Sequence, residues 1–455
     1  MEGVLNLFVS IVGQPAILIS LIALLGLVLQ KKKFSDVVQG TVKTFVGFLV
    51  LIGGAGLIST SLDPFAKMFQ QALHTQGVVP SNEAVVAIAL QQLGTPTALI
   101  MLVGMITNII LARFTRFKYI FLTGQAMLYM SAFTAAILVG AGLKPSPLMI
   151  IIGGIFEGTL LTVTPALTQP FMRKITGNDS VAMGHTGNIG YAISGYIGKL
   201  VGDKEKSTED LNIPKSFGFL RDSTVSIILL MGVVYIVLAL MAGPKYVESQ
   251  LSDGTNAVVY ALVQAGTFTA GFVVVLQGVR MVLAEIVPAF QGIAKKLVPN
   301  SKPALDVPIV FPYAPNAILI GFFVSFLVGT ISMFAMVGMK TTVIIPGVVG
   351  HFFCGAAAGV YGNATGGRKG AIAGAAFNGL LISWLPLFIL PVLGQLKGAS
   401  STFADTDYLI PGLALGYLGQ AGAGILIAGI ISFVVIVVLS SVILNNRDKK
   451  LEKVK

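Results

Sequence analysis

The sequence contains 455 residues, of which 55% are hydrophobic and only 11% are charged. Soluble domains carry about 25% charged residues, so this composition excludes a soluble enzyme and a disordered chain. A single cysteine, Cys354, excludes an intrachain disulfide scaffold. In a membrane protein, the net charge of +11 indicates basic residues at the cytoplasmic surface, so no nucleic-acid partner is expected.

Taken in chain order, eleven segments carry almost no charge and are long enough to cross a bilayer as helices, which takes roughly 20 apolar residues. They are residues 3–30, 44–62, 95–112, 119–142, 147–168, 223–243, 256–278, 316–338, 342–361, 370–393 and 421–444. The segment at 345–361 is rich in Gly and Ala, so this span could be interrupted. The sequence therefore predicts an all-α polytopic membrane protein that forms one membrane unit.

The positions of lysine and arginine predict the orientation of these helices. With the N-terminus outside, 25 of the 30 basic residues lie on the inner side, as the positive-inside rule requires. An odd number of crossings places the C-terminus in the cytoplasm. The charged segment 202–222 is then expected to be a cytoplasmic loop rather than a domain.

A weak internal repeat divides the chain into two halves, 1–222 and 223–455. The pieces that resemble one another are 39–43 with 277–280 and 95–100 with 314–319. Each half also contains a Pro-rich piece that is too polar to span, near 79–93 and near 300–315. Paired interrupted segments at matched positions are typical of inverted repeats that build a substrate site near the membrane midplane. The alternative is that both pieces are ordinary Pro-rich loops.

Four acidic residues stand out because the chain around them is apolar or Pro-rich. A charge inside the bilayer costs ~2.5 to 3.5 kcal/mol, so Glu83 and Asp306 in the two hairpins are expected to face a cavity, or else to cap hairpin helices. Glu157 follows two glycines and is expected to form a structural hydrogen bond. Glu285 lies in the charged, helix-patterned segment 279–298, where pairing with a basic residue at the inner interface is expected.

Polar residues within and between the spans give further candidates. His185 belongs to the run Gly-His-Thr-Gly-Asn at 184–188, which lacks hydrophobic periodicity and favours a functional role. Gln125 and Tyr129 are four residues apart, so one helix face presents both to a common ligand. His351 lies in an apolar segment and is expected to be a packing residue.

Several catalytic motifs are missing from the sequence. It contains no phosphate-binding GxxxxGK[ST] loop, no HExxH and no GxSxG elbow. Cys354 sits between Phe and small residues, where a thiol behaves as a buried hydrophobe rather than a nucleophile. We therefore expect a transporter subunit and not an enzyme, with no cofactor and no metal site.

Four runs of residues carry a resemblance to a known family. They are 184–188 (GHTGN), 198–211 (GKLVGDKEKSTEDL), 277–286 (QGVRMVLAEI) and 313–317 (YAPNA). The chain resembles the membrane (IIC) component of the L-ascorbate-type phosphotransferase system from about Lys33 to the last span. The resemblance implies a homodimer in the bacterial inner membrane, whose scaffold supports a core that moves like an elevator. It also implies phosphorylation of the incoming substrate by a separate IIB protein, which IIA supplies with phosphate.

The resemblance also implies a set of substrate ligands. The positions that match are Asn82, Glu83, Gln125, Tyr129, His185, Thr186 and Asp306. Of these, only His185 and Asp306 keep the residue of the ascorbate pattern. That pattern has Thr-Tyr at Asn82-Glu83, His at Gln125, Gln at Tyr129 and Gln at Thr186. An acidic Glu83 beside an acidic ligand is unfavourable unless it is protonated.

Three functions therefore stay open at the level of sequence. The first is a phosphotransferase permease for a sugar or sugar acid such as ascorbate. The second is the same system carrying a polyol or neutral sugar, which the change to Glu83 favours. The third is an ion-coupled secondary transporter of the same architecture, with Asp306 and Glu83 as proton sites.

Overall fold

The computed structural model describes residues 14–212, 214–394, 396 and 401–452. Residues 3–13 of the first expected span and the side chain of Glu285 therefore lie outside the described part. Within that part, eight helices are long and apolar enough to cross a membrane, and two shorter apolar helices accompany them. The predicted all-α polytopic membrane class is confirmed.

The helices follow the chain in this order: α2 (Pro15–Leu29), α3 (Phe34–Leu73), α4 (Asn82–Phe114), α5 (Gly124–Gly140), α6 (Pro147–Thr176), α7 (Asn188–Val201), α8 (Ser223–Ala242), α9 (Pro244–Gln250), α10 (Ala257–Leu297), α11 (Pro315–Gly338), α12 (Val348–Gly350), α13 (Ala356–Ile389), α14 (Thr406–Gln420) and α15 (Ala423–Glu452). Short turns of helix are η1 (Thr208–Asp210), η2 (Lys215–Arg221), η3 (Val307–Tyr313), the π-turn η4 (His351–Gly355) and η5 (Leu390–Val392). The π-turn is the interruption expected within 342–361.

Helix α13 is a hairpin of two limbs rather than one straight rod. Its chain leaves helical geometry at Gly367, where φ is +56° and ψ is −146°. A Cβ added to Gly362 would touch the carbonyl oxygen of Gly370, although a straight helix would hold these residues about 12 Å apart. The single apolar run at 348–392 therefore contains two crossing segments, as the expected spans 342–361 and 370–393 require.

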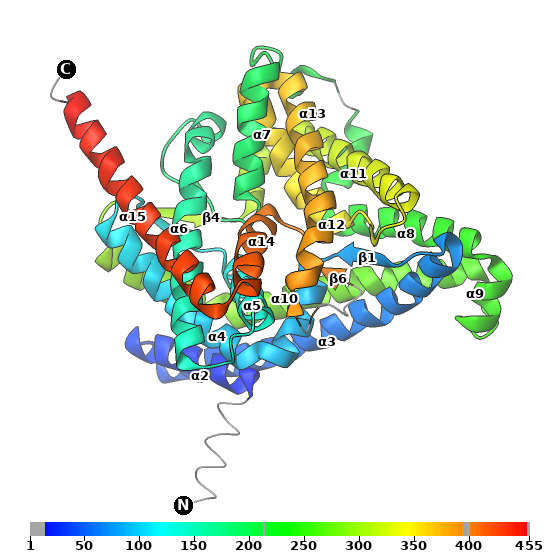
Figure 1. Cartoon of the computed structure of the whole chain (residues 1–455), viewed down its shortest axis with the longest axis horizontal. Coiled ribbons are helices and arrows are strands. Elements are labelled where there is room, and N and C mark those ends of the chain that lie inside the picture. Colours follow the sequence, from blue (N-terminus) through cyan, green and yellow to red (C-terminus); the bar gives the residue numbers. More distant parts are fainter. Residues whose placement is uncertain (1–13, 213, 395, 397–400, 453–455) are drawn as a thin grey trace, which may run out of the picture.

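The longest two helices, α3 and α10, pack against each other and run obliquely through the molecule (Figure 1). A helix of 40 residues is about 60 Å long, twice the hydrocarbon thickness of a bilayer. Gly54 and Gly271 let the helices approach closely, because a Cβ on either would meet backbone of the other helix. The segment 279–298 continues α10 without a break, so the separate interfacial helix expected there is part of a longer one.

Two small parallel sheets accompany the helices, in the orders β5-β1-β6 and β2-β4-β3. The strands are β1 (Gly77–Pro80), β2 (Tyr119–Phe121), β3 (Ala182–Met183), β4 (Lys302–Leu305), β5 (Val343–Ile344) and β6 (Ser401–Thr402). Val78 lies opposite Ile344, Pro80 opposite Thr402, Phe121 opposite Ala304 and Met183 opposite Leu305. In each sheet, the central strand comes from one half of the chain and the two outer strands come from the other half. β1 lies between β5 and β6, and β4 lies between β2 and β3. The two sheets therefore share one arrangement of strands.

The two Pro-rich pieces have matching shapes. In the first, β1 leads into a short helix that breaks at Leu93, where φ and ψ are −127° and 24°, before α4 continues. In the second, β4 leads into η3, which breaks at Ala314 before α11 begins. β1 and β4 are each paired with a strand on both sides. This pairing gives hydrogen-bond partners to backbone N–H and C=O groups, which non-helical chain inside a membrane needs.

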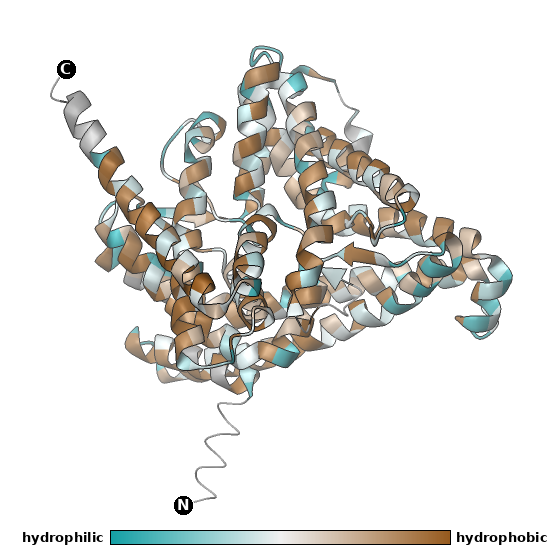
Figure 2. Cartoon of the chain, in the orientation of Figure 1, coloured by the Kyte–Doolittle hydropathy of each residue, from teal (hydrophilic) through white to brown (hydrophobic). Residues whose placement is uncertain are grey.

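Helices α7 and α14 begin where the strands β3 and β6 end, and neither was among the expected spans. α7 packs against α13 and stands beside it in Figure 1, and α14 also contacts α13. Hydrophobic colour extends along α15 in Figure 2, and only 22% of its apolar window is buried inside the protein, which fits a helix that faces lipid. The fold thereby brings two strand-to-helix junctions and two hairpins to one central region.

Candidate functional site

A cavity of about 210 Å³ lies where the two hairpins and the two strand-to-helix junctions meet. Its wall is formed by Asn82, Glu83, Thr123, Gln125, Ala126, Tyr129, His185, Thr186, Ser223, Leu276, Arg280, Asp306, Pro308, Val349, Gly350, Phe353, Asp405 and Tyr408. All seven candidate ligands from the sequence are in this set. These seven residues come from four separate stretches of the chain between positions 82 and 306, and the fold brings them to one place.

Asn82 and Glu83 lie at the start of the short helix in the first hairpin. Ser81 caps that helix by accepting a 3.4 Å hydrogen bond from the backbone N–H of Ala84. Glu83 is 4% exposed, and its Oε2 accepts from Ser81 Oγ at 3.3 Å. Since Ser81 supplies the cap, capping alone does not account for the buried carboxylate of Glu83.

The amide of Asn82 ties the first hairpin to the junction before α14. Its Nδ2 donates to Asp405 Oδ1 at 2.8 Å, and its Oδ1 accepts from the backbone N–H of Ala404 at 2.9 Å. These two bonds fix which way the amide points. Asn82 therefore lines the cavity with an orientation that the protein itself determines.

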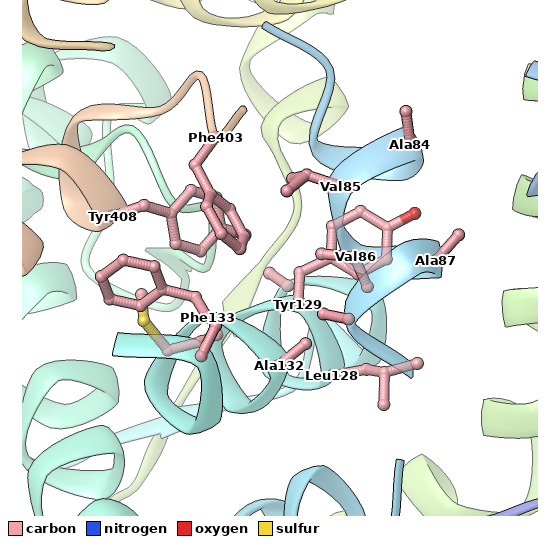
Figure 3. Packing of buried hydrophobic residues seen from close by; sticks show 14 of the residues in the cluster. Ala84, Val85, Val86, Ala87, Leu128, Tyr129, Ala132, Phe133, Phe403 and Tyr408 are labelled. Carbon is pink, nitrogen blue, oxygen red and sulfur yellow. The ribbon is translucent and has the colours of Figure 1, made fainter. Parts of the chain in front are cut away.

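Gln125 and Tyr129 lie one turn apart on α5, as expected, and both line the cavity. Behind them, the rings of Phe133, Phe403 and Tyr408 form a packed cluster with centroids 5.1 to 5.4 Å apart (Figure 3). Edge and tilted contacts of this kind stabilise aromatic groups beyond simple burial. The cluster gives this side of the cavity a rigid support.

His185 and Thr186 follow β3 directly and precede α7. The Nδ1 of His185 accepts a 3.2 Å hydrogen bond from the backbone N–H of Gly187 and lies 2.7 Å from the hydroxyl of Tyr191. Because a backbone N–H only donates, Nδ1 is the acceptor, and the proton of the neutral ring is assigned to Nε2. Thr186 Oγ1 donates to Asp405 Oδ2 at 2.5 Å.

Asp306 is the first residue after β4 and caps η3. Its Oδ1 accepts from the backbone N–H of Val307 at 2.7 Å. The capping role considered from the sequence is therefore present. Asp306 also lines the cavity, so one carboxylate serves the local structure and faces the candidate site.

Sequence reasoning missed Asp405, which is 2% exposed and bonds two of the predicted residues. It follows β6 as His185 and Thr186 follow β3. Nearby, the carboxylate of Asp407 accepts from the backbone N–H groups of Asn188 and Ile189 at 3.1 and 2.8 Å. The N-terminus of α7 is thus capped from α14. The polar run at 405–407 before an apolar helix is the signal in the sequence that indicates this helix start.

Three hydroxyl groups on the cavity wall are buried without a hydrogen-bond partner among the described residues: Thr123 Oγ1, Tyr129 Oη and Tyr408 Oη. Buried polar groups are nearly always hydrogen-bonded in proteins. Their clustering around one cavity is what a site for a polar ligand requires. Arg280 from α10 adds a guanidinium to the same wall.

Among the described residues, one group could offer metal ligands: His185, Cys354 and Asp405, with ligand atoms within 4.8 Å of one another. Asp405 Oδ2 already accepts from Thr186, and its distance to His185 Nε2 is 4.0 Å. Cys354 is 1% exposed, as expected for a small hydrophobic residue.

Two other polar residues lie away from the cavity. Glu157 on α6 accepts a 2.8 Å hydrogen bond from Ser131 and lies against Gly104, the close helix approach expected for it. The Nδ1 of His351 lies 2.8 Å from Ser325 Oγ, and the ring is 2% exposed. Both have the structural roles predicted for them.

Comparison with known proteins gives two findings. The model of a family described as the sugar-specific permease component of the phosphotransferase system (PTS) matches residues 10–407. A curated protein of Mycoplasma pneumoniae, named as the ascorbate-specific PTS system EIIC component, is 28% identical over 419 residues. That alignment covers 79% of this chain and 62% of the relative, so the chain spans less than two thirds of the relative's length.

Proposed function

Because the chain belongs to the family of sugar-specific permease components of the phosphotransferase system, we propose that it carries a sugar or sugar acid into the cell for phosphorylation by a separate IIB protein. IIB in turn receives phosphate from IIA. The chain is a multi-pass membrane transporter subunit, and the phosphoryl transfer takes place on its partner. No cofactor enters this scheme.

The observation that supports this proposal is the convergence of the seven candidate ligands on one cavity. Asn82, Glu83, Gln125, Tyr129, His185, Thr186 and Asp306 would be the substrate-binding residues. The buried hydroxyls without partners supply further donors and acceptors. Small-molecule sites typically combine a formed cavity with a few converging polar groups.

The cavity wall also supports a division into two moving parts. Ser223 of α8 and Leu276 and Arg280 of α10 face the hairpins across the cavity. With α2 and α3, which pack on α10, these helices would form the scaffold, and the remaining elements the core. We propose that the scaffold forms a homodimer in the lipid bilayer and that the core moves against it. Scaffold and core are then interleaved across the half-repeats 1–222 and 223–455.

The orientation that we propose has the N-terminus outside and the C-terminus in the cytoplasm of a bacterial cell. Single cysteines introduced at Lys144 and at Lys204 test it with an impermeant thiol reagent. The native Cys354 is buried and serves as the unlabelled background. Labelling of intact cells at position 144 and not at 204 is expected, and the reverse would overturn the orientation.

Uptake with and without the cognate IIB tests the proposed function. Cells that express the chain with IIA and IIB should accumulate phosphorylated substrate, and omission of IIB should abolish that product. L-Ascorbate is the first probe, because the curated relative is named for it. Accumulation of unmodified substrate without IIB would overturn the phosphotransferase role.

A second candidate is an ion-coupled transporter, which the buried carboxylates of Glu83 and Asp405 beside Asp306 favour. Acidic residues inside membranes often mark proton pathways. Purified chain in proteoliposomes distinguishes the two: uptake driven by a proton or sodium gradient alone would support the ion-coupled transporter.

A further inference from the structure

The junctions before α7 and α14 hold a donor and an acceptor that face each other without touching. His185 Nε2 and Asp405 Oδ2 are 4.0 Å apart, with side chains 14% and 3% exposed. Direct N–H···O hydrogen bonds are about 2.7 to 3.2 Å long, so this pair does not form one. Both residues line the cavity. Since the two atoms do not hydrogen-bond to each other across this gap, both can bond a third group in the cavity.

The hydrogen-bond network fixes what each side of the gap offers. The backbone N–H of Gly187 donates to His185 Nδ1, which leaves the ring proton on Nε2. Asp405 offers a carboxylate oxygen, held in place because Asn82 and Thr186 donate to its two oxygens. The gap presents one donor and one acceptor.

A hydroxyl group matches this pair, because it accepts from Nε2–H and donates to the carboxylate at the same time. An ionised acid group of a ligand has no proton to donate. It would also lie against Asp405 in a cavity that contains Glu83, an acidic residue that the ascorbate pattern lacks. Arg280 is the one arginine or lysine on the described wall, which also carries the carboxyl groups of Glu83, Asp306 and Asp405.

We propose that Asp405 and His185 together recognise a substrate hydroxyl group, and that the cavity selects uncharged polyhydroxylated molecules, polyols or neutral sugars, over acidic ones. This inference rests on the proposed function, since it names the substrate class of the same cavity. Asp405 is then a substrate-binding residue in addition to the seven predicted from the sequence. It also positions two of them, Asn82 and Thr186.

The test measures binding of D-sorbitol, D-glucose and L-ascorbate to the purified full-length chain by isothermal titration. We expect at least one uncharged probe to bind and ascorbate to bind at least about tenfold more weakly, the factor that corresponds to one unfavourable charge contact. Ascorbate binding equal to or tighter than both uncharged probes would overturn the proposal. Failure of both uncharged probes to bind at millimolar concentration would do so too.

Asp405→Asn changes the acceptor into an amide of the same shape. Its Oδ1 still accepts from Asn82, while its Nδ2 replaces the acceptor at the gap with a donor. We expect at least a tenfold loss of affinity for the uncharged probe and a shift of selectivity toward ascorbate, because one negative charge is removed. Asp63→Asn, an exposed residue paired with Lys67 on α3, is the matched control and should bind as wild type.

A double-mutant cycle separates substrate recognition from a purely structural role. If one hydroxyl bridges the pair, the losses from His185→Ala and Asp405→Asn should be non-additive by at least about threefold. Additive losses would overturn the bridge. Uptake without IIB would contradict the phosphotransferase role and leave this binding result standing, so the two proposals fail independently.

Discussion

The two halves of the molecule share a backbone plan and differ in the chemistry that they bring to the centre. β1 and β4 are each the middle strand of a three-stranded sheet, and each leads into a short, broken helix. After β1 come Asn82 and Glu83, whereas Asp306 follows β4. After β3 come His185 and Thr186, whereas the acidic Asp405 occupies the matching place after β6.

This difference indicates that the repeated backbone sets the positions of the site residues, whereas their side chains determine which substrate groups they bind. A sugar or polyol that is chemically different at its two ends needs unlike groups around it. In the first half, the strand-to-helix junction offers a ring N–H and a hydroxyl, and in the second half it offers a carboxylate. Contacts between the halves, such as Asn82 to Asp405, join the unlike groups into one site.

The largest expected effect comes from removing the acidic residue of the second hairpin. Asp306→Ala should lower substrate affinity by about 10- to 100-fold, the value of a hydrogen bond to a charged group, while the chain stays folded. Equilibrium binding to the purified protein measures the loss, and gel filtration checks the assembly.

Asp222→Ala is the matched control for that substitution. Asp222 caps α8 by accepting from the N–H of Val225 at 3.0 Å, but it lies outside the cavity wall. Asp222→Ala should lower the free energy of unfolding by only about 1 kcal/mol, because the helix loses its cap. Wild-type affinity in the Asp306→Ala variant would show that the two halves do not share one substrate site.

The turns inside the two halves provide the next comparison. Gly367 joins the limbs of α13 with a φ of +56°, and a Cβ there would meet the carbonyl oxygens of Asp203 and Lys206. Gly142, in the turn between α5 and α6, has a φ of +88° but open space around it. Gly367→Ala should therefore destabilise the protein by about 1 to 3 kcal/mol more than Gly142→Ala, which carries only the backbone strain.

Thermal unfolding in detergent measures both glycine variants against wild type. Gly367→Ala should have a clearly lower thermal unfolding midpoint than Gly142→Ala. Equal midpoints would mean that the turn at Gly367 between the two limbs of α13 is not crowded.

The smallest effect concerns an ion cluster that only one of the two sheets has among the described residues. Asp179 accepts hydrogen bonds from Arg173, Gln169 and Lys302, the last at the start of β4. The matching position at the start of β1 is Gly77. Burial alone would raise the pKa of Asp179, but these bonds hold the pKa well below its usual range.

Asp179→Asn should lower stability at neutral pH by no more than about 1 kcal/mol, since the group is 43% exposed to solvent. A carboxylate with a lowered folded pKa stabilises the protein above its unfolded pKa, near 3.8, and the contribution fades as the pH falls below that value. The difference in unfolding free energy between wild type and variant should be constant from pH 7 to pH 5 and shrink below pH 4. A difference that grows on acidification would refute this assignment.

Much of this architecture could be predicted from the sequence because apolar runs and Pro-rich pieces carry strong signals. Seven residues chosen from the sequence line one cavity. The sheets could not be predicted, since strands of two to four residues leave no alternating pattern. The continuation of α10 to Leu297 was also missed, because charge at 280, 295 and 296 suggested a separate segment.

Asp405 illustrates what sequence reasoning lacks. A polar run such as 405–407 before a short apolar helix is common at helix starts. Its importance depends on contacts with Asn82 and Thr186, which lie 323 and 219 residues away. The pairing of β1 with β6 brings Asp405 close to Asn82, and a backbone hydrogen bond from Asp407 to Thr186 joins the two strand-to-helix junctions.

The most direct measurement is an experimental structure of the chain with its transported substrate bound. The account predicts substrate density in the cavity between the halves, in contact with His185, Asp306 and Asp405. Density confined to another site, such as the apolar groove between α2, α4 and α10, would contradict it.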